Sequence, residues 1–563
     1  MIAPRLRRWR RFIFWGLGLL LLLLGGLWYA GEYYVGPLLR ERLEVLIVRG
    51  SDSLYRYDVG KLDASLFGGS VEIDELNVRV DSNRYRQLEA ARQLPPLTFE
   101  VKMHHGHLRK VNVFGLLFGK KVEVGELFTS DAQVELSRHT RDERAERASS
   151  ASVPLWRAIR PSMNSIQLHE LRLEGIRFKY AYADTAEAQQ IKFDTCNVRV
   201  RDIKVDSATA ADGTRIGYAR VFTLHLSDLK FRSADSATKF KAKWIDYSSE
   251  GRRLTIDSFK LQPTRKDKES FYAHHGTQRD MTVIEFGRLA FEGFQLERFL
   301  NANSVVADSL VILGPKISIY NDKTLPPSLE GKMGRYPHQF LQRSAFGIKL
   351  KHLALRDLEL SYTEKGEKTG REGTLLLEGI QLAASNISNF PDDIKRDSLL
   401  RVRASGRLLG SAIETKMDFH LNSGEGRFDM EGRIGAMSAA QLNTVSEPLG
   451  NARIRSLNLQ ELQFFLHGDE YTARGEVRMR YRNLAVELQK EDEATGLLKT
   501  RVFLNKLLNK YTLRHDNPDA SGREMRATQV QQSRLMTQAF FGLVWKSIFS
   551  GMQTIMTNAG TEY

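Results

Sequence analysis

The chain has 563 residues, with 83 lysine or arginine and 68 aspartate or glutamate residues, and a formal net charge of +15. A single hydrophobic core stops growing at roughly 250–300 residues, so this length predicts several domains or one elongated body. Positive charge favours nucleic acid or an anionic membrane as a partner, but the basic residues are scattered between apolar residues of predicted strands and form no stripe with aromatics, which argues against nucleic acid.

The first predicted element is a transmembrane helix. Phe12 to Ala30 is an apolar run without a charged residue, about 28 Å long as a helix against a hydrocarbon core of roughly 30 Å. Five arginines lie between Arg5 and Arg11, whereas the charges after the run are mixed, so the positive-inside rule predicts a cytoplasmic N-terminus. A cleaved signal peptide is the alternative, but the apolar run is long and no small-x-small site follows it. We predict residues 1–33 as a cytoplasmic tip and membrane anchor.

Strand signals dominate from residue 34 to about residue 490. Pairs of apolar residues two apart recur at a five-residue step, most regularly from Ile348 to Leu360. Within a pair, the period of two places both side chains on one face of a strand. The step of three between pairs keeps that face only if a β-bulge absorbs one residue. The pattern predicts a mainly β fold, with an elongated, twisted antiparallel sheet that forms an open apolar groove.

The paired apolar residues of several strands are the candidate lining of this groove. They are Ile166, Leu168, Leu171, Leu173, Leu226, Leu229, Leu289, Phe291, Ile348, Leu350, Leu353, Leu355, Leu457 and Leu459. A leucine-rich repeat would need an asparagine where Ile176 and Leu358 stand, and a pentapeptide-repeat helix would need many more consecutive turns. An ordinary antiparallel sandwich with a closed core stays open as an alternative.

Residues 491–563 are predicted to be a helical segment, with helices at Leu497–Tyr511 and Val530–Thr557. The last helix is amphipathic, and we predict that its aromatic side faces a membrane through Phe540, Phe541, Trp545 and Phe549. The alternative is that the helix packs on the apolar face of the sheet or caps its edge.

Little in the sequence points to catalysis. It contains no Gly-x-Ser-x-Gly, no phosphate-binding loop and no Cys-x-x-Cys. His105 and His107 would lie roughly 7 Å apart on one strand face, but no neighbouring Asp, Glu or Cys completes a metal-ligand set. The single cysteine, Cys196, excludes a disulfide and has no local activating group. We predict no catalytic residue, metal site or cofactor.

Several weak motifs occur in an order typical of one family. They are Ile317–Lys323 before Pro326-Pro327, Leu360–Glu364, Ala440–Asn443 before Pro448, Gly475–Leu484, and Asn517-Pro518 with Val544–Ser547. With the repeated strand pattern, they cover most of the chain and resemble the AsmA-like envelope proteins of Gram-negative bacteria, in a form similar to that of Bacteroidetes. These proteins are similar to bridge-like lipid-transfer proteins, whose strands build an open apolar groove.

The resemblance implies a non-enzymatic inner-membrane protein with a periplasmic body that carries phospholipid between membranes for outer-membrane lipid homeostasis. It implies the inner membrane as a partner, and the outer membrane or an envelope protein at the C-terminal helix. Two acyl chains hold about thirty methylenes, so extracting a lipid costs on the order of 25 kcal/mol unless apolar surface replaces the bilayer. The competing hypothesis is a non-enzymatic envelope assembly or scaffold protein with a closed β core.

Overall fold

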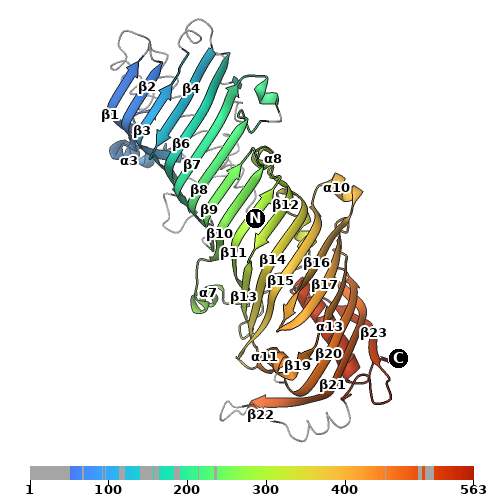
Figure 1. The fold of residues 1–563 in the computed structure, drawn as a ribbon. Coiled ribbons are helices and arrows are strands. Elements are labelled where there is room, and N and C mark those ends of the chain that lie inside the picture. The colour runs from blue at the N-terminus through green and yellow to red at the C-terminus, as the bar shows by residue number, and fades with distance from the viewer. Residues whose placement is uncertain are drawn as a thin grey trace. The chain divides into compact units, whose positions relative to one another are not determined.

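A computed structural model shows a mainly β protein, as the sequence predicts (Figure 1). Its strands belong to a single mixed, largely antiparallel sheet of 23 strands, and one further short strand pairs separately. The chain divides into two compact units. The structure describes residues 48, 51–65, 69–91, 93–95, 97–112, 121–139, 156–157, 164–182, 190–212, 215–233, 237–450, 452–491, 498–500 and 513–563.

The predicted N-terminal anchor, residues 1–33, lies outside the described residues. Within the described part of the chain, no helix is both long enough and apolar enough to cross a membrane. The prediction of a transmembrane helix therefore stays a prediction from the sequence.

Unit 1 comprises residues 1–259 and 292–303. Its helices are α3 (Ser82–Ala90) and α8 (Leu296–Ala302), with a short 3-10 turn at Thr209–Ala211. Its strands are β1 (Tyr55–Ser65), β2 (Ser70–Val80), β3 (Leu97–Arg109), β4 (Lys121–Ser130), β5 (Gln133–Arg138), β6 (Ser165–Tyr182), β7 (Gln190–Val205), β8 (Val221–Arg232), β9 (Thr238–Ser248) and most of β10 (Arg253–Pro263).

Unit 2 comprises residues 260–291 and 304–563. Its helices are α7 (Lys268–His275), α9 (Pro337–Gln342), α10 (Pro391–Arg396), α11 (Ala439–Gly450) and α13 (Phe540–Met556). Its strands are β11 (Met281–Glu292), β12 (Ser304–Leu313), β13 (Lys316–Asp322), β14 (Gly347–Lys365), β15 (Glu372–Ser388), β16 (Leu399–Leu408), β17 (Ser411–His420), β18 (Phe428–Ile434), β19 (Met437–Ser438), β20 (Ala452–Gly468), β21 (Thr472–Glu491), β22 (Leu498–Thr500), β23 (Met525–Ser533) and β24 (Thr561–Glu562).

Both units contain the same arrangement of one long strand and two short ones. In unit 1, β4 and β5 pair in parallel with successive halves of β6, and β6 pairs antiparallel with β7. In unit 2, β12 and β13 pair in the same way with β14, which pairs with β15. The apolar pairs of the two long strands then occupy equivalent places, with Leu171 opposite Leu127 in unit 1 and Leu353 opposite Leu310 in unit 2. The recurring sequence pattern therefore marks a recurring strand arrangement.

A β-bulge is confirmed at one of the predicted steps on each long strand, whereas the pairing shows no register shift between Leu168 and Leu171 or between Leu350 and Leu353. The pairing of β6 with β7 shifts on either side of Ile176, and the pairing of β14 with β15 shifts on either side of Leu358. Gly175 and Asp357, each just before the shifted residue, have φ of 65° and 60°. A bulge of this kind absorbs one residue, so the apolar side chains before and after it stay on one face.

Each unit has a covered hydrophobic core at one part of its sheet. In unit 1 the core gathers residues of β1 to β7 with Leu88 of α3, and Leu171 at its centre is fully buried. In unit 2, α13 packs on β21 and β23, where Val477 and Leu543 are fully buried. The predicted helix Val530–Thr557 is shorter than expected and begins at Phe540, because the preceding residues pair with β21 as β23. Strand β22 likewise replaces the start of the predicted helix Leu497–Tyr511, whose residues 501–511 lie outside the described part.

The core of unit 2 contains a histidine that makes its stability depend on pH. His338 is 1 % exposed and its ring lies 4.9 Å from that of Phe419, and burial lowers the pKa of His338 to about 4. The unfolded chain, with an ordinary histidine pKa of about 6.5, then binds the proton more readily than the folded chain. The free energy of unfolding therefore keeps its full value above about pH 6.5. It falls as the pH drops toward 4, and protonation linked to His338 accounts for a loss on the order of 3 kcal/mol.

Urea unfolding at pH 7 and pH 4.5 measures this effect. Trp545 is the only tryptophan of unit 2, so its fluorescence reports on that unit when the other tryptophans are replaced by phenylalanine. We expect His338→Phe to lose less stability between the two pH values than the parent chain does. Equal losses in both chains would show that His338 contributes nothing to the pH dependence.

Candidate functional site

The strand register of unit 1 separates an apolar row from a polar row. Leu173, Val198, Leu224 and Tyr247 lie directly opposite one another across β6, β7, β8 and β9. The neighbouring row, one residue along each strand, consists of Arg172, Arg199, Thr223 and Ser248. Because successive side chains of a strand point to opposite faces, these rows define an apolar face and a polar face at this place in unit 1.

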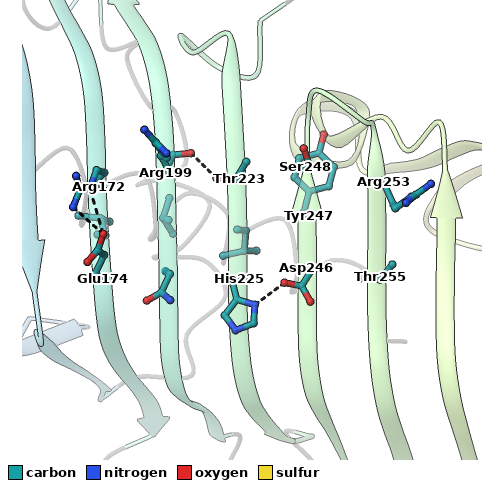
Figure 2. Close-up of a pocket in the computed structure, with 14 residues that line it drawn as sticks. Arg172, Glu174, Arg199, Thr223, His225, Asp246, Tyr247, Ser248, Arg253 and Thr255 are labelled. Atoms are coloured by element: carbon teal, nitrogen blue, oxygen red, sulfur yellow. Dashed lines mark hydrogen bonds and ion pairs between the residues drawn. The ribbon is translucent and has the colours of Figure 1, made fainter.

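An open hollow of about 490 Å³ in unit 1 is lined by ten polar residues and by the four apolar residues Leu173, Val198, Leu224 and Tyr247 (Figure 2). Each of its arginines has a carboxylate partner: Arg172 lies 3.1 Å from Glu174, Arg253 lies 2.8 Å from Glu292, and Arg199 contacts Glu170. The labelled His225 and Asp246 also pair, at 2.5 Å (Figure 2). The charges of this hollow are thus satisfied within the protein, and we interpret it as a solvated surface.

The apolar face of unit 1 carries a row of stacked phenylalanines that the sequence analysis did not single out. Phe178 of β6 stacks on Phe193 of β7 with ring centroids 5.0 Å apart. Phe231 of β8 stacks on Phe240 of β9 at 4.6 Å, and Phe240 on Phe259 of β10 at 5.6 Å. All five side chains are only partly buried. We call these five residues the phenylalanine row.

The phenylalanine row continues the apolar face of β6. Leu173 and Ile176 pair with Val198 and Cys196, which lie two residues apart on β7 and therefore on one face. Phe178 follows Ile176 by two residues and shares its face. The bulges around Ile176 thus join the covered core near Leu173 to the partly exposed row that begins at Phe178.

The fourteen predicted groove residues divide by burial into two groups of seven. The buried group is 0 to 9 % exposed and consists of Leu168, Leu171, Leu173, Leu226, Leu350, Leu457 and Leu459. The partly buried group consists of Ile166, Leu229, Leu289, Phe291, Ile348, Leu353 and Leu355. Members of the first group, such as Leu171 and Leu459, are core residues of their units, whereas the second group keeps apolar surface open to solvent.

Unit 2 has partly exposed apolar rows of its own. Leu353 lies between Leu310 of β12 and Ala384 of β15, and two residues on, Leu355 lies between Ile312 and Leu382. Leu353 and Leu355 each have an apolar neighbour on both adjacent strands, yet their side chains are only partly buried. These rows leave apolar surface of unit 2 partly open to solvent, as the phenylalanine row does in unit 1.

The structure separates Phe540 from the other three aromatic residues predicted to face a membrane. Phe540 is 4 % exposed, with its ring 4.9 Å from the rings of both Tyr336 and Phe428. Phe541, Trp545 and Phe549 are 62 %, 43 % and 43 % exposed. Phe540 is thus a core residue of unit 2, while the other three residues present aromatic surface to solvent.

The histidines of β3 have carboxylate partners that sequence reasoning missed. His105 Nδ1 lies 2.6 Å from a carboxylate oxygen of Asp74 on β2, and His107 Nε2 lies 3.3 Å from one of Glu126 on β4. Burial lowers the pKa of His107, which opposes its protonation. Among the residues that the structure describes, no group of three or more His, Cys, Asp or Glu side chains is arranged to hold a metal ion.

Cys196 lies in the covered part of the sheet. It is 8 % exposed, and burial raises the pKa of its thiol to about 12. A thiol with such a pKa holds almost no thiolate at neutral pH, and the thiolate is the reactive form. The placement fits the structural role expected from the sequence.

No protein-family model matches the chain, and no curated protein is significantly similar to it. The fold itself therefore defines the class: a mainly β protein built on a mixed sheet, with no family assigned. Its apolar surface is covered in one part of each unit and left open to solvent in another.

Proposed function

We propose that the protein carries phospholipid along the partly exposed apolar face of its sheet, as a non-enzymatic, AsmA-like component of the bacterial envelope. The phenylalanine row carries this proposal. Exposed apolar area costs roughly 25 cal/mol per Å² in water, so five partly exposed phenylalanines on one face are unfavourable unless something apolar covers them. Acyl chains supply such a cover.

The chemistry of the two faces suits a lipid that moves. Contacts between methylenes and aromatic rings have no fixed direction, so an acyl chain can slide from one apolar row to the next without breaking a hydrogen bond. The polar face keeps the sheet soluble, because its arginines and carboxylates pair with one another in water. A headgroup stays in water while the acyl chains lie against the open apolar face.

The proposed location rests on the N-terminal sequence. Residues 1–33 would anchor the chain in the inner membrane with the N-terminus in the cytoplasm and the β body in the periplasm. From there the protein would take phospholipid toward the outer membrane and support outer-membrane lipid homeostasis.

Mass spectrometry of the purified full chain tests the function. The chain should be recovered with the inner membrane, and after detergent extraction it should retain phospholipid in stoichiometric amounts. A single-span inner-membrane protein of similar size, purified in the same detergent, sets the background. Phospholipid at or below that background would contradict the proposal.

The alternative function is envelope assembly by a closed β scaffold. It is favoured by the covered cores, in which Leu171 and Leu457 are buried as in an ordinary sandwich. The two functions differ at the phenylalanine row, which contacts lipid in the first and solvent or a protein in the second. Substitution within this row distinguishes them.

A further inference from the structure

Helix α13 has more apolar surface than its packing in unit 2 requires. Its buried face includes Leu543 and Ile555, both fully buried, with Ser547 and Gly551 between them. A side chain at Gly551 would place its first carbon 2.5 Å from Val477 Cγ2, so the helix and β21 already lie in closest contact. This face completes the core, and further apolar residues on α13 are not needed for the fold.

The surplus surface lies along one flank of the helix. Phe541, Trp545 and Phe549 follow one another at four-residue spacing, which places them in one row. The rings of Trp545 and Phe549 stack with centroids 6.3 Å apart. Directly before the helix, Leu535 and Met536 are 60 % and 70 % exposed. We call these five residues the C-terminal apolar patch.

Leu535 and Met536 are held outward by an ordered anchor, Arg534. Its buried guanidinium donates hydrogen bonds to the carbonyl oxygens of Gln538 at 2.8 Å, Glu470 at 3.2 Å and Lys332 at 2.6 Å. The guanidinium also lies over the ring of Tyr336 at 4.3 Å. In addition, the backbone N–H of Lys332 donates to the carbonyl of Met536 at 2.7 Å. The exposure of the patch is therefore built into the fold of unit 2.

The charges around the patch indicate its occupant. The segment from Met525 to Gly560 holds no aspartate or glutamate and three basic residues; Arg526 pairs with Glu524 at 3.5 Å and Arg534 is buried, which leaves Lys546 as its exposed positive charge. Lys546 is exposed, next to Trp545 in the sequence, and has no ion-pair partner among the described residues. Tryptophan and phenylalanine beside lysine are typical of surfaces that enter the interface of a bilayer containing anionic lipid.

A second copy of the chain fits the patch less well. A two-fold contact through the aromatic row would bring the two Lys546 side chains toward each other, and like charges oppose such a contact. We propose that the C-terminal apolar patch binds the surface of a bilayer that contains anionic phospholipid. This binding goes beyond the proposed lipid transport and does not depend on it.

Vesicle flotation tests the proposal with the full chain. The chain is purified in nanodiscs of phosphatidylcholine, which occupy its N-terminal segment, and is mixed with vesicles of phosphatidylethanolamine and phosphatidylglycerol. The parent chain should float with the vesicles. In the triple variant Phe541→Ser, Trp545→Ser and Phe549→Ser, binding to the vesicles should fall at least about tenfold. Its thermal unfolding should match that of the parent, because these side chains lie outside the core.

Matched controls separate the patch from general loss of hydrophobicity. Phe465→Ser with Trp244→Ser removes aromatic surface that is 44 % and 36 % exposed elsewhere, and should leave flotation unchanged. Trp545→Phe should retain binding, and Lys546→Glu should weaken it on anionic vesicles only. Parent-like flotation of the triple variant would overturn the proposal. The proposal would also be overturned if the chains in separate nanodiscs associated through the patch but did not bind vesicles. That result would identify a second copy of the chain as the occupant.

Discussion

Phe240→Asp should abolish lipid contact in unit 1 while the protein still accumulates. The side chain of Phe240 stacks on Phe231 and Phe259 in the middle of the phenylalanine row. A carboxylate there is partly open to water, so it does not unfold the chain. An acyl chain crossing it would have to desolvate the charge, at a cost of several kcal/mol. The probe is a photoactivatable amino acid at Leu229, which lies on the same strand as Phe231. It should crosslink phospholipid in the parent chain, and the yield should fall at least about tenfold in the Phe240→Asp variant.

The neighbouring residue supplies the control. Lys241 follows Phe240 on β9, is exposed, and points to the opposite face. Lys241→Asp introduces the same carboxylate one residue away and should leave crosslinking at the parent level. Undiminished crosslinking in a folded Phe240→Asp chain would contradict a lipid path along this face. Loss of the folded protein would instead show that the row belongs to a closed core.

Much of the sheet follows from local sequence pattern. Alternation within the apolar pairs predicts the strands, and the odd step between pairs predicts the bulges beside Gly175 and Asp357, because both depend on residues close together in one strand. The start of α13 was misplaced for a related reason. Val530 and Gln531 belong to a polar stretch without Gly or Pro that is compatible with a helix, but they pair with Gly475 and Arg474 on β21, and long-range pairing overrides local propensity.

The site is predictable only in part, because burial depends on what covers a residue. Leu171 and Leu353 occupy equivalent places in similar sequence patterns, yet only Leu171 is fully buried. The phenylalanine row was missed because Phe193, Phe240 and Phe259 come together only through the register of four strand pairings. The carboxylates that pair with His105 and His107 come from other strands and were missed for the same reason.

Leu171→Ala and Leu353→Ala should therefore differ strongly in their effect on stability. Leu171 is fully buried in the core of unit 1, so its truncation removes buried methyl groups and leaves a cavity, which costs about 2–5 kcal/mol. Leu353 already faces solvent in part, so the same truncation should cost less than half as much, about 1 kcal/mol. Urea unfolding followed through Trp244 for unit 1 and Trp545 for unit 2, each in a chain without the other tryptophans, measures both costs. Leu353→Met, which keeps the apolar volume, serves as the control and should unfold like the parent. Equal costs for the two alanine variants would mean that Leu353 is as deeply covered in solution as Leu171, and unit 2 would then offer no open apolar row to a lipid.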